Sequence, residues 1–123
     1  MKSDPKHILI VDDEWPNRMN LEILLENDYQ VTCAEDGQQG LDYLQQQVFH
    51  LIITDLNMPK IDGTAFIKEA HQVTPDSKII VLTGYDKSDE IVKLMKQGVI
   101  IQFAQKPVNI PWLIDIVHKT LKD

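Results

Sequence analysis

The chain has 123 residues, of which 43% are apolar and 25% charged, a composition typical of one globular domain. Its net charge of −7 excludes the basic surface that nucleic-acid binding normally requires, and an anionic membrane would repel it. No apolar run approaches the roughly 20 residues that span a bilayer, and the one cysteine, Cys33, cannot form an internal disulfide. We therefore expect a cytoplasmic protein without direct contacts to nucleic acid or membrane.

Short β-branched runs alternate along the chain with longer segments whose apolar residues recur at helical spacing. Strands are predicted at His7–Val11, Tyr29–Ala34, Leu51–Thr54, Lys78–Leu82 and Ile100–Ala104. Helices are predicted at Pro16–Leu25, Gly37–Gln47, Thr64–Gln72, Asp86–Gln97 and Asn109–Leu121, with Asn109 as the cap of the last. Continuous apolar strands are buried on both faces, as in a parallel sheet covered by helices. The alternation predicts a doubly wound α/β fold, whose ligand site lies at the carboxyl ends of the strands.

Polar side chains follow four of these strands at the point where each apolar run stops. Asp12 and Asp13 follow the first strand, Asp55 the third, Thr83 the fourth and Lys106 the fifth. The topology would bring them to one edge, where three carboxylates repel one another unless a cation offsets them. Oxygen ligands of this kind suit Mg²⁺, while a lysine and a hydroxyl complement a phosphoryl group. The set predicts a magnesium-assisted site for a phosphorylated carboxylate.

Four segments in this order carry a family resemblance: Ile8–Glu14, Ile52–Gly63, Ile79–Gly84 and Lys106–Pro107. Together they resemble the receiver domain of two-component response regulators over nearly the whole chain. The resemblance implies a flavodoxin-like topology, with a five-stranded parallel sheet of order 2-1-3-4-5 flanked by five helices. It also implies a single receiver domain over residues 1–123 with no output domain, either standing alone or cut from a longer regulator.

By resemblance, Asp55 is the phosphoacceptor. Asp12 and Asp13 are similar to the acidic pair that holds Mg²⁺ together with Asp55 and the main-chain carbonyl of Asn57. Of the pair, Asp13 is expected to be the more direct ligand and Asp12 to act partly through water.

The resemblance also assigns the phosphoryl-binding and switch residues. Thr83 and Lys106 would each bind a phosphoryl oxygen, and the Lys106–Pro107 peptide bond is expected to be cis. Thr83 and Phe103 would form the switch, with Phe103 in place of the tyrosine often found in the family. The fourth helix, fifth strand and fifth helix would form the face that rearranges.

Smaller features accompany these assignments. Pro59 and Gly63 are expected to shape the loop after Asp55, and Tyr85 occupies a position that influences hydrolysis in the family. Asp62 is predicted to cap a helix. For Val99–Ile101 the favoured interpretation is a strand start packed under the last helix, and the alternative is an apolar patch for a partner or dimer.

The implied function is a signalling switch that catalyses only its own phosphorylation and dephosphorylation. The implied partners are a histidine kinase or phosphotransfer protein as donor and an effector domain or protein downstream. A homodimer through the switch face is a further expectation. The alternative is a degenerate receiver that binds proteins without phosphorylation. An aspartate-nucleophile hydrolase is disfavoured because Asn57 stands where such enzymes have a second aspartate, and a flavin carrier because the acids after the first strand would repel a phosphate.

Overall fold

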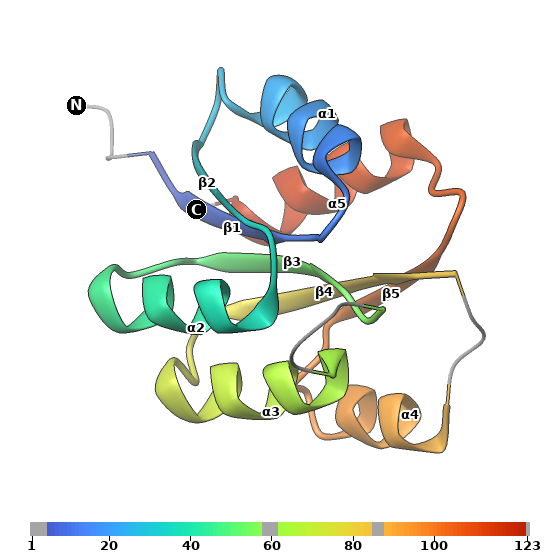
Figure 1. The fold of residues 1–123 in the computed structure, drawn as a ribbon. Helices are drawn as coiled ribbons and strands as arrows, with labels where there is room; N and C mark the ends of the chain where they lie inside the picture. The colour runs from blue at the N-terminus through green and yellow to red at the C-terminus, as the bar shows by residue number, and fades with distance from the viewer. Residues whose placement is uncertain (1–4, 58–61, 85–87, 123) are drawn as a thin grey trace.

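The computed structural model describes residues 5–57, 62–84 and 88–122, so Pro59 and Tyr85 lie outside the described residues. Strands and helices alternate along the chain (Figure 1): β1 His7–Val11, α1 Trp15–Leu25, β2 Gln30–Ala34, α2 Gly37–Gln46, β3 Leu51–Asp55, α3 Gly63–Val73, β4 Lys78–Thr83, α4 Asp89–Lys96, β5 Gln102–Gln105 and α5 Ile110–Leu121. The strands form one parallel sheet of order β2-β1-β3-β4-β5, which confirms the predicted fold and strand order. In the described part of the chain, no helix is both long enough and apolar enough for a membrane span.

Two apolar layers cover the faces of the sheet. Ile8 and Ile10 point to the layer formed with α1 and α5, while Leu9 and Val11 point to the layer formed with α2, α3 and α4. Every residue of β1 and β3 is buried, because both strands have neighbours on each side and helices on both faces. The edge strand β2 is more exposed, as its alternating sequence predicts.

Side-chain caps fix where four helices begin. The capping side chains accept hydrogen bonds from first-turn backbone amides and belong to Asp36 in α2, Asp62 in α3, Ser88 in α4 and Asn109 in α5. The caps predicted at Asp62 and Asn109 are confirmed. Helix α4 begins at Asp89, where the extended Ser88 serves as the cap, and the predicted start at Asp86 lies outside the described residues.

The segment before β5 differs from the prediction. The strand begins at Gln102, and Val99 and Ile100 lie ahead of it, 8% and 2% exposed. Gly98, with φ of 78°, ends α4, and the amides of Val99 and Ile100 then donate to the carbonyl of Leu94. These bonds turn both side chains into the layer under α4 rather than under the last helix. The predicted packing under the last helix was therefore wrong for Val99 and Ile100, and so was the alternative of an exposed patch, whereas Ile101 packs on the layer formed with α1 and α5.

A histidine is buried at the opposite edge of the sheet from the predicted site. His7 is 7% exposed, its ring lies 4.1 Å from the Phe49 ring between centroids, and its Nε2 is 2.7 Å from Thr32 Oγ1. Its backbone amide donates to Nδ1 of His50 at 3.0 Å. Burial, and secondarily the charge of His50, lower the pKa of His7 below its ordinary value of 6.5. Protonating this ring is therefore less favourable in the folded protein than in the unfolded chain.

This lowered pKa makes stability depend on pH. Below about pH 6.5 the unfolded chain binds a proton at His7 that the folded chain resists. We therefore expect the free energy of unfolding, measured by urea denaturation, to be constant above that pH and to fall as the pH drops through it. The His7→Gln variant should show a smaller dependence, and His71→Gln should keep it. Equal pH dependence in His7→Gln and the wild type would contradict this account.

Candidate functional site

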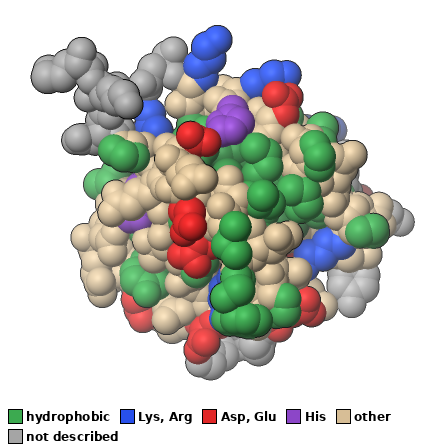
Figure 2. All heavy atoms as spheres, turned by 90° about the horizontal axis from the view of Figure 1, so that it is seen from above, with side chains coloured by type: hydrophobic (Ala, Val, Ile, Leu, Met, Phe, Trp, Pro, Cys, Tyr) green, Lys and Arg blue, Asp and Glu red, His purple; other side chains and the backbone are tan. Residues whose placement is uncertain are grey.

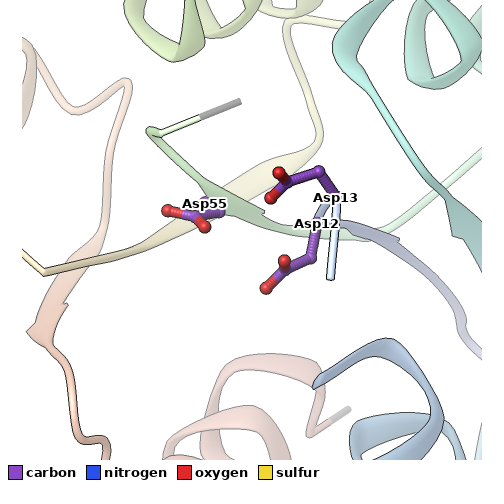
Figure 3. Close-up of side chains that lie close together, drawn as sticks. All are labelled: Asp12, Asp13 and Asp55. Atoms are coloured by element: carbon purple, nitrogen blue, oxygen red, sulfur yellow. The ribbon is translucent and has the colours of Figure 1, made fainter. Parts of the chain in front are cut away.

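The carboxyl ends of four strands meet at one edge of the sheet and place the predicted polar residues there. Asp12 and Asp13 directly follow β1, and Asp55 is the last residue of β3. One carboxyl oxygen from each of the three acids lies within 4.8 Å of the others, and Figure 3 shows the three carboxyl groups side by side. Thr83 ends β4 next to β3 in the sheet and is fully buried.

Lys106 crosses from the end of β5 to this cluster. Its ammonium donates to Asp55 Oδ2 at 3.0 Å and lies 3.6 Å from Asp12 Oδ2. Its backbone amide donates to the carbonyl of Thr83 at 2.7 Å, and the Lys106–Pro107 peptide bond is cis. Burial lowers the pKa of Lys106, but the hydrogen bond to Asp55 and the charge of Asp12 outweigh burial and raise it. The ammonium therefore stays charged.

Asp12 is the most confined acid of the cluster. It is 3% exposed and accepts hydrogen bonds from the backbone amide of Glu14 at 2.9 Å and from Asn17 Nδ2 at 3.3 Å. Burial raises its pKa above 3.8, with a smaller contribution from the charge of Asp55, although the Glu14 amide and Lys106 act in the opposite direction. Ionised Asp12 therefore lowers the free energy of unfolding of the protein.

Asp13 and Asp55 border one cavity, whereas Asp12 borders another. The cavity has a volume of about 380 Å³ and is lined by Asp13, Glu14, Asp55, Asn57, Gly84 and Lys106. Asp12 instead lines an adjoining cavity of about 220 Å³, which extends along apolar residues of α1 and α5. A ligand entering from solvent on the first side would meet Asp55 and Asp13 before Asp12.

The donor set fits a small hard cation. Mg²⁺ binds oxygen ligands at about 2.0–2.1 Å, which places ligand atoms up to about 4 Å apart around the ion. The three carboxyl oxygens, all within 4.8 Å of one another, need only a small closing movement to reach that spacing. When the three carboxyl groups are ionised, they and the Lys106 ammonium carry a net charge of −2, which one divalent cation would neutralise. Asp12, Asp13 and Asp55 could therefore hold Mg²⁺.

Asn57 and Phe103 lie beside the cluster rather than in it. The Asn57 backbone amide donates to Asp55 Oδ1 at 3.1 Å, which holds its main chain against the acid. Phe103 is half-buried in β5, opposite Val81, and packs on the apolar layer under α2, α3 and α4. The structure thus places Asn57 next to the acids and Phe103 on β5, which β4 separates from the strand of Asp55.

Two residues that sequence reasoning missed also contact the cluster. Asn17 donates to Asp12 and to Glu14 Oε2, and Arg18 Nη1 donates to the carbonyl of Asp12 at 2.7 Å. Both lie in the first turns of α1. The apolar periodicity of this segment predicts which residues are buried, but it carries no information about polar residues such as these. Their nearness to an acidic pair was the only available signal, and such a signal is weak because exposed helices often carry Asn and Arg.

Gly63 brings α3 close to the loop that follows Asp55. Its amide donates to the carbonyl of Leu56 at 3.2 Å. A Cβ at Gly63 would overlap the Leu56 Cα and lie 2.5 Å from the Leu56 carbonyl oxygen, so only glycine fits here. By contrast, a Cβ at Gly84, on the neighbouring loop, would meet no atom within 4 Å.

With this geometry in place, comparison with known proteins defines the class. A profile described as the response regulator receiver domain matches residues 8–118. The chain belongs to the response regulator receiver domain family, whose members are signalling domains. It spans only about a quarter of the length of the first curated relatives it matches, which are transcriptional regulatory proteins.

One shorter relative and two solved structures match over most of their length. Sporulation initiation phosphotransferase F of Bacillus subtilis is 32% identical over 93% of this chain and 92% of its own. A CheY-like receiver domain protein from Methanospirillum hungatei has a TM-score of 0.89 and 30% identity, covering 96% of this chain and 94% of that one. The response regulator TrrA from Thermotoga maritima, solved in complex with Mg²⁺ and BeF, has a TM-score of 0.78 and 32% identity over 94% and 99%.

The Gly63 contact leads to a stability test with a matched control. We expect Gly63→Ala to lower the free energy of unfolding by about 1–3 kcal/mol, because the added methyl group forces the Leu56 backbone away. Gly84→Ala, which adds the same atom in open space, should change it by less than about 0.5 kcal/mol. Urea denaturation measures both. Equal losses in the two variants would show that the close approach at Leu56 is not what requires glycine.

The burial of Asp12 leads to a test of the electrostatic cost. In magnesium-free buffer at pH 7 we expect Asp12→Asn to raise the free energy of unfolding by about 0.5–2 kcal/mol, because a buried like charge is removed. The gain should shrink as the pH falls toward 3.8, where the wild-type carboxyl group becomes neutral as well. Asp76→Asn, an exposed acid at the opposite edge, is the control. A loss of stability in Asp12→Asn at pH 7 would contradict this interpretation.

Proposed function

We propose that the domain is a phosphorelay switch that accepts a phosphoryl group on Asp55 in a Mg²⁺-dependent reaction. The observation that carries this proposal is the cluster itself, in which three carboxyl groups lie within 4.8 Å and the Lys106 ammonium is 3.0 Å from Asp55. The open cavity beside Asp55 gives a donor access to the acid. The relative solved with Mg²⁺ and BeF supports the same cation and a phosphoryl mimic at a similar fold.

The donor in this proposal is the phosphohistidine of a histidine kinase or phosphotransfer protein. The bond between phosphorus and the imidazole nitrogen breaks as a carboxylate oxygen of Asp55 bonds to phosphorus. The imidazole, protonated on its other nitrogen, leaves as the neutral ring. Bound Mg²⁺ supplies positive charge that offsets the carboxylates and the phosphoryl oxygens. Asp12, Asp13, Asp55 and the main-chain carbonyl of Asn57 would hold it, with Asp12 acting partly through water.

Lys106 and Thr83 receive the phosphoryl group. Lys106 already pairs with the Asp55 carboxylate, so its ammonium needs only a short movement to reach a phosphoryl oxygen. The Thr83 hydroxyl donates to another oxygen, since Thr83 ends the strand next to that of Asp55. Water later hydrolyses the acyl phosphate. Because the domain acts only on itself in both steps, we class it as a signalling domain rather than an enzyme.

The switch in this proposal runs from Thr83 to Phe103. Phosphorylation adds negative charge and acceptor oxygens at the edge of the sheet, and Thr83 moves toward them. Phe103 then turns inward into the space that Thr83 leaves. The two residues are close enough for this because β4 and β5 are neighbouring strands, with Val81 opposite Phe103. The α4–β5–α5 face then changes shape to control an effector domain or protein, or to form a homodimer.

The donor would dock beside the cluster on α1. Trp15, Met19 and Ile23 follow one another at four-residue spacing and are 58%, 39% and 56% exposed. Figure 2 shows hydrophobic side chains on the face that α1 and α5 cover.

The names of the relatives, transcriptional regulatory proteins and a phosphotransferase, support upstream donors and downstream effectors. The single free cysteine supports a cytoplasmic location.

Asp55 can be tested directly as the acceptor. We expect acetyl phosphate with Mg²⁺ to add one phosphoryl mass to the wild-type chain in intact-protein mass spectrometry. Asp55→Asn should add none, because the amide is not a nucleophile for phosphoryl transfer. Asp62→Asn, which keeps its cap and lies outside the cluster, should be modified like the wild type.

Two outcomes would overturn this proposal. Modification of Asp55→Asn to the wild-type extent would mean that another residue is the acceptor. A wild-type chain that takes up no phosphoryl group and shows no spectral change with Mg²⁺ and beryllofluoride would favour the degenerate receiver, which binds proteins without phosphorylation.

A further inference from the structure

We propose that Arg18 is a positioning residue for the acidic cluster. In this proposal its guanidinium holds the peptide between Asp12 and Asp13 so that both carboxyl groups face Asp55. The inference rests on the proposed function, because it says how the same site is kept in shape for Mg²⁺.

The contact that supports this role is made to the main chain. Asp12 lies just past the last residue of β1, and its amide still donates to the carbonyl of Ala34 at 3.1 Å. Its own carbonyl oxygen instead accepts a hydrogen bond from Arg18 Nη1 at 2.7 Å. A hydrogen bond from a charged donor is stronger than one between neutral groups. Arg18 therefore holds the chain at the point where it leaves the sheet.

The orientation of this peptide sets the direction of the acids. The peptide group is planar, so fixing its carbonyl oxygen also fixes the plane that leads to the Asp13 Cα. Rotation of that plane would swing the exposed Asp13 carboxyl group away from Asp55. The Asp12 side chain is held separately, by the Glu14 amide and Asn17. Arg18 is thus a side chain that hydrogen-bonds directly to the main chain joining the two acids.

Charge and position give opposite expectations for Arg18. As a cation bonded to the main chain between two of the acids, the guanidinium would repel Mg²⁺, and its removal would strengthen Mg²⁺ binding by Coulomb's law. As a positioning group, it keeps the ligands together, and its removal would weaken binding. The sign of the change therefore separates the two roles.

The surroundings of Arg18 allow a conservative test. The residue is half-buried and lines a cavity of about 290 Å³ with Trp15, Met19 and Cys33. Methionine keeps an unbranched apolar stem in this place but has no donor and no charge. Lysine keeps the charge and one donor on a flexible stem.

The experiment titrates the metal-free wild type and variants with Mg²⁺ alone, at fixed ionic strength, by calorimetry. We expect Arg18→Met to weaken Mg²⁺ binding by about 10-fold, at the lower end of the effect of removing residues that orient metal ligands. Arg18→Lys should recover part of this loss, because its ammonium can donate to the Asp12 carbonyl. Lys119→Met removes one positive charge from the exposed end of α5 and should bind like the wild type.

A second measurement separates positioning from general loss of structure. In metal-free protein we expect Arg18→Met to shift the amide resonances of Asp13 and Glu14 and to leave those of His7 and Val117 in place. If Arg18→Met is too unstable to titrate, Arg18→Lys gives the same comparison, with smaller shifts at the same two amides.

Equal or tighter Mg²⁺ binding by Arg18→Met would overturn the positioning role, and so would unchanged resonances at Asp13 and Glu14. Either result, with Asp55 still taking up a phosphoryl group, would leave the proposed function standing. A wild type that binds no Mg²⁺ would instead refute the Mg²⁺-dependent function, and the role of Arg18 with it.

Discussion

Three carboxyl groups crowded at one edge of the sheet are the constraint on which this site depends. Asp12 and Asp55 are 3% and 4% exposed, so little water screens their charges. Lys106 offsets part of that charge through its ion pairs with both. Burial, with a smaller contribution from the charge of Asp55, still raises the pKa of Asp12, so its ionised form stays unfavourable despite Lys106. An arrangement that is unfavourable by itself becomes favourable when a divalent cation binds, which is the physical reason to expect Mg²⁺ here.

The fold makes this crowding possible. In a parallel sheet all strands end at the same edge, so acids that are far apart in the sequence meet without a special loop. β1 and β3 are neighbours, and β4 and β5 continue the sheet on the same side, which brings Thr83 and Lys106 within reach. The buried layers on both faces hold these strand ends rigidly. Asp55 lies inside β3, whereas Asp12 and Asp13 lie just past the end of β1 and depend also on contacts in that loop.

Much of this arrangement could be predicted from the sequence because it follows from strong and repeated signals. Apolar runs predict the buried strands, and the polar residue that ends each run predicts the edge where the site forms. The strand order came from the family resemblance, since periodicity carries no information about which strands are neighbours. Where a single residue decided the local path the prediction was wrong, as at Gly98, whose positive φ sends Val99 and Ile100 under α4.

Contacts made by one side chain to a distant backbone atom could not be predicted. The hydrogen bond from the His7 amide to His50 joins residues 43 positions apart. Neither histidine stands at a sequence distance from other polar residues that is typical of metal ligands or catalytic groups. The contact between Arg18 and the Asp12 carbonyl depends on the rotamer of one arginine. Such contacts depend on the packed structure rather than on a pattern in the sequence, and at Asp12 they help to shape the site.

The most direct measurement is a crystal structure of the chain with Mg²⁺ and beryllofluoride. We expect beryllium bonded to a carboxylate oxygen of Asp55, Mg²⁺ contacted by Asp13, and the Lys106 ammonium moved from the Asp55 carboxylate to a fluorine atom. Beryllofluoride bound at another residue, or Lys106 still paired with a bare Asp55 carboxylate at saturating concentrations of both ions, would contradict the account.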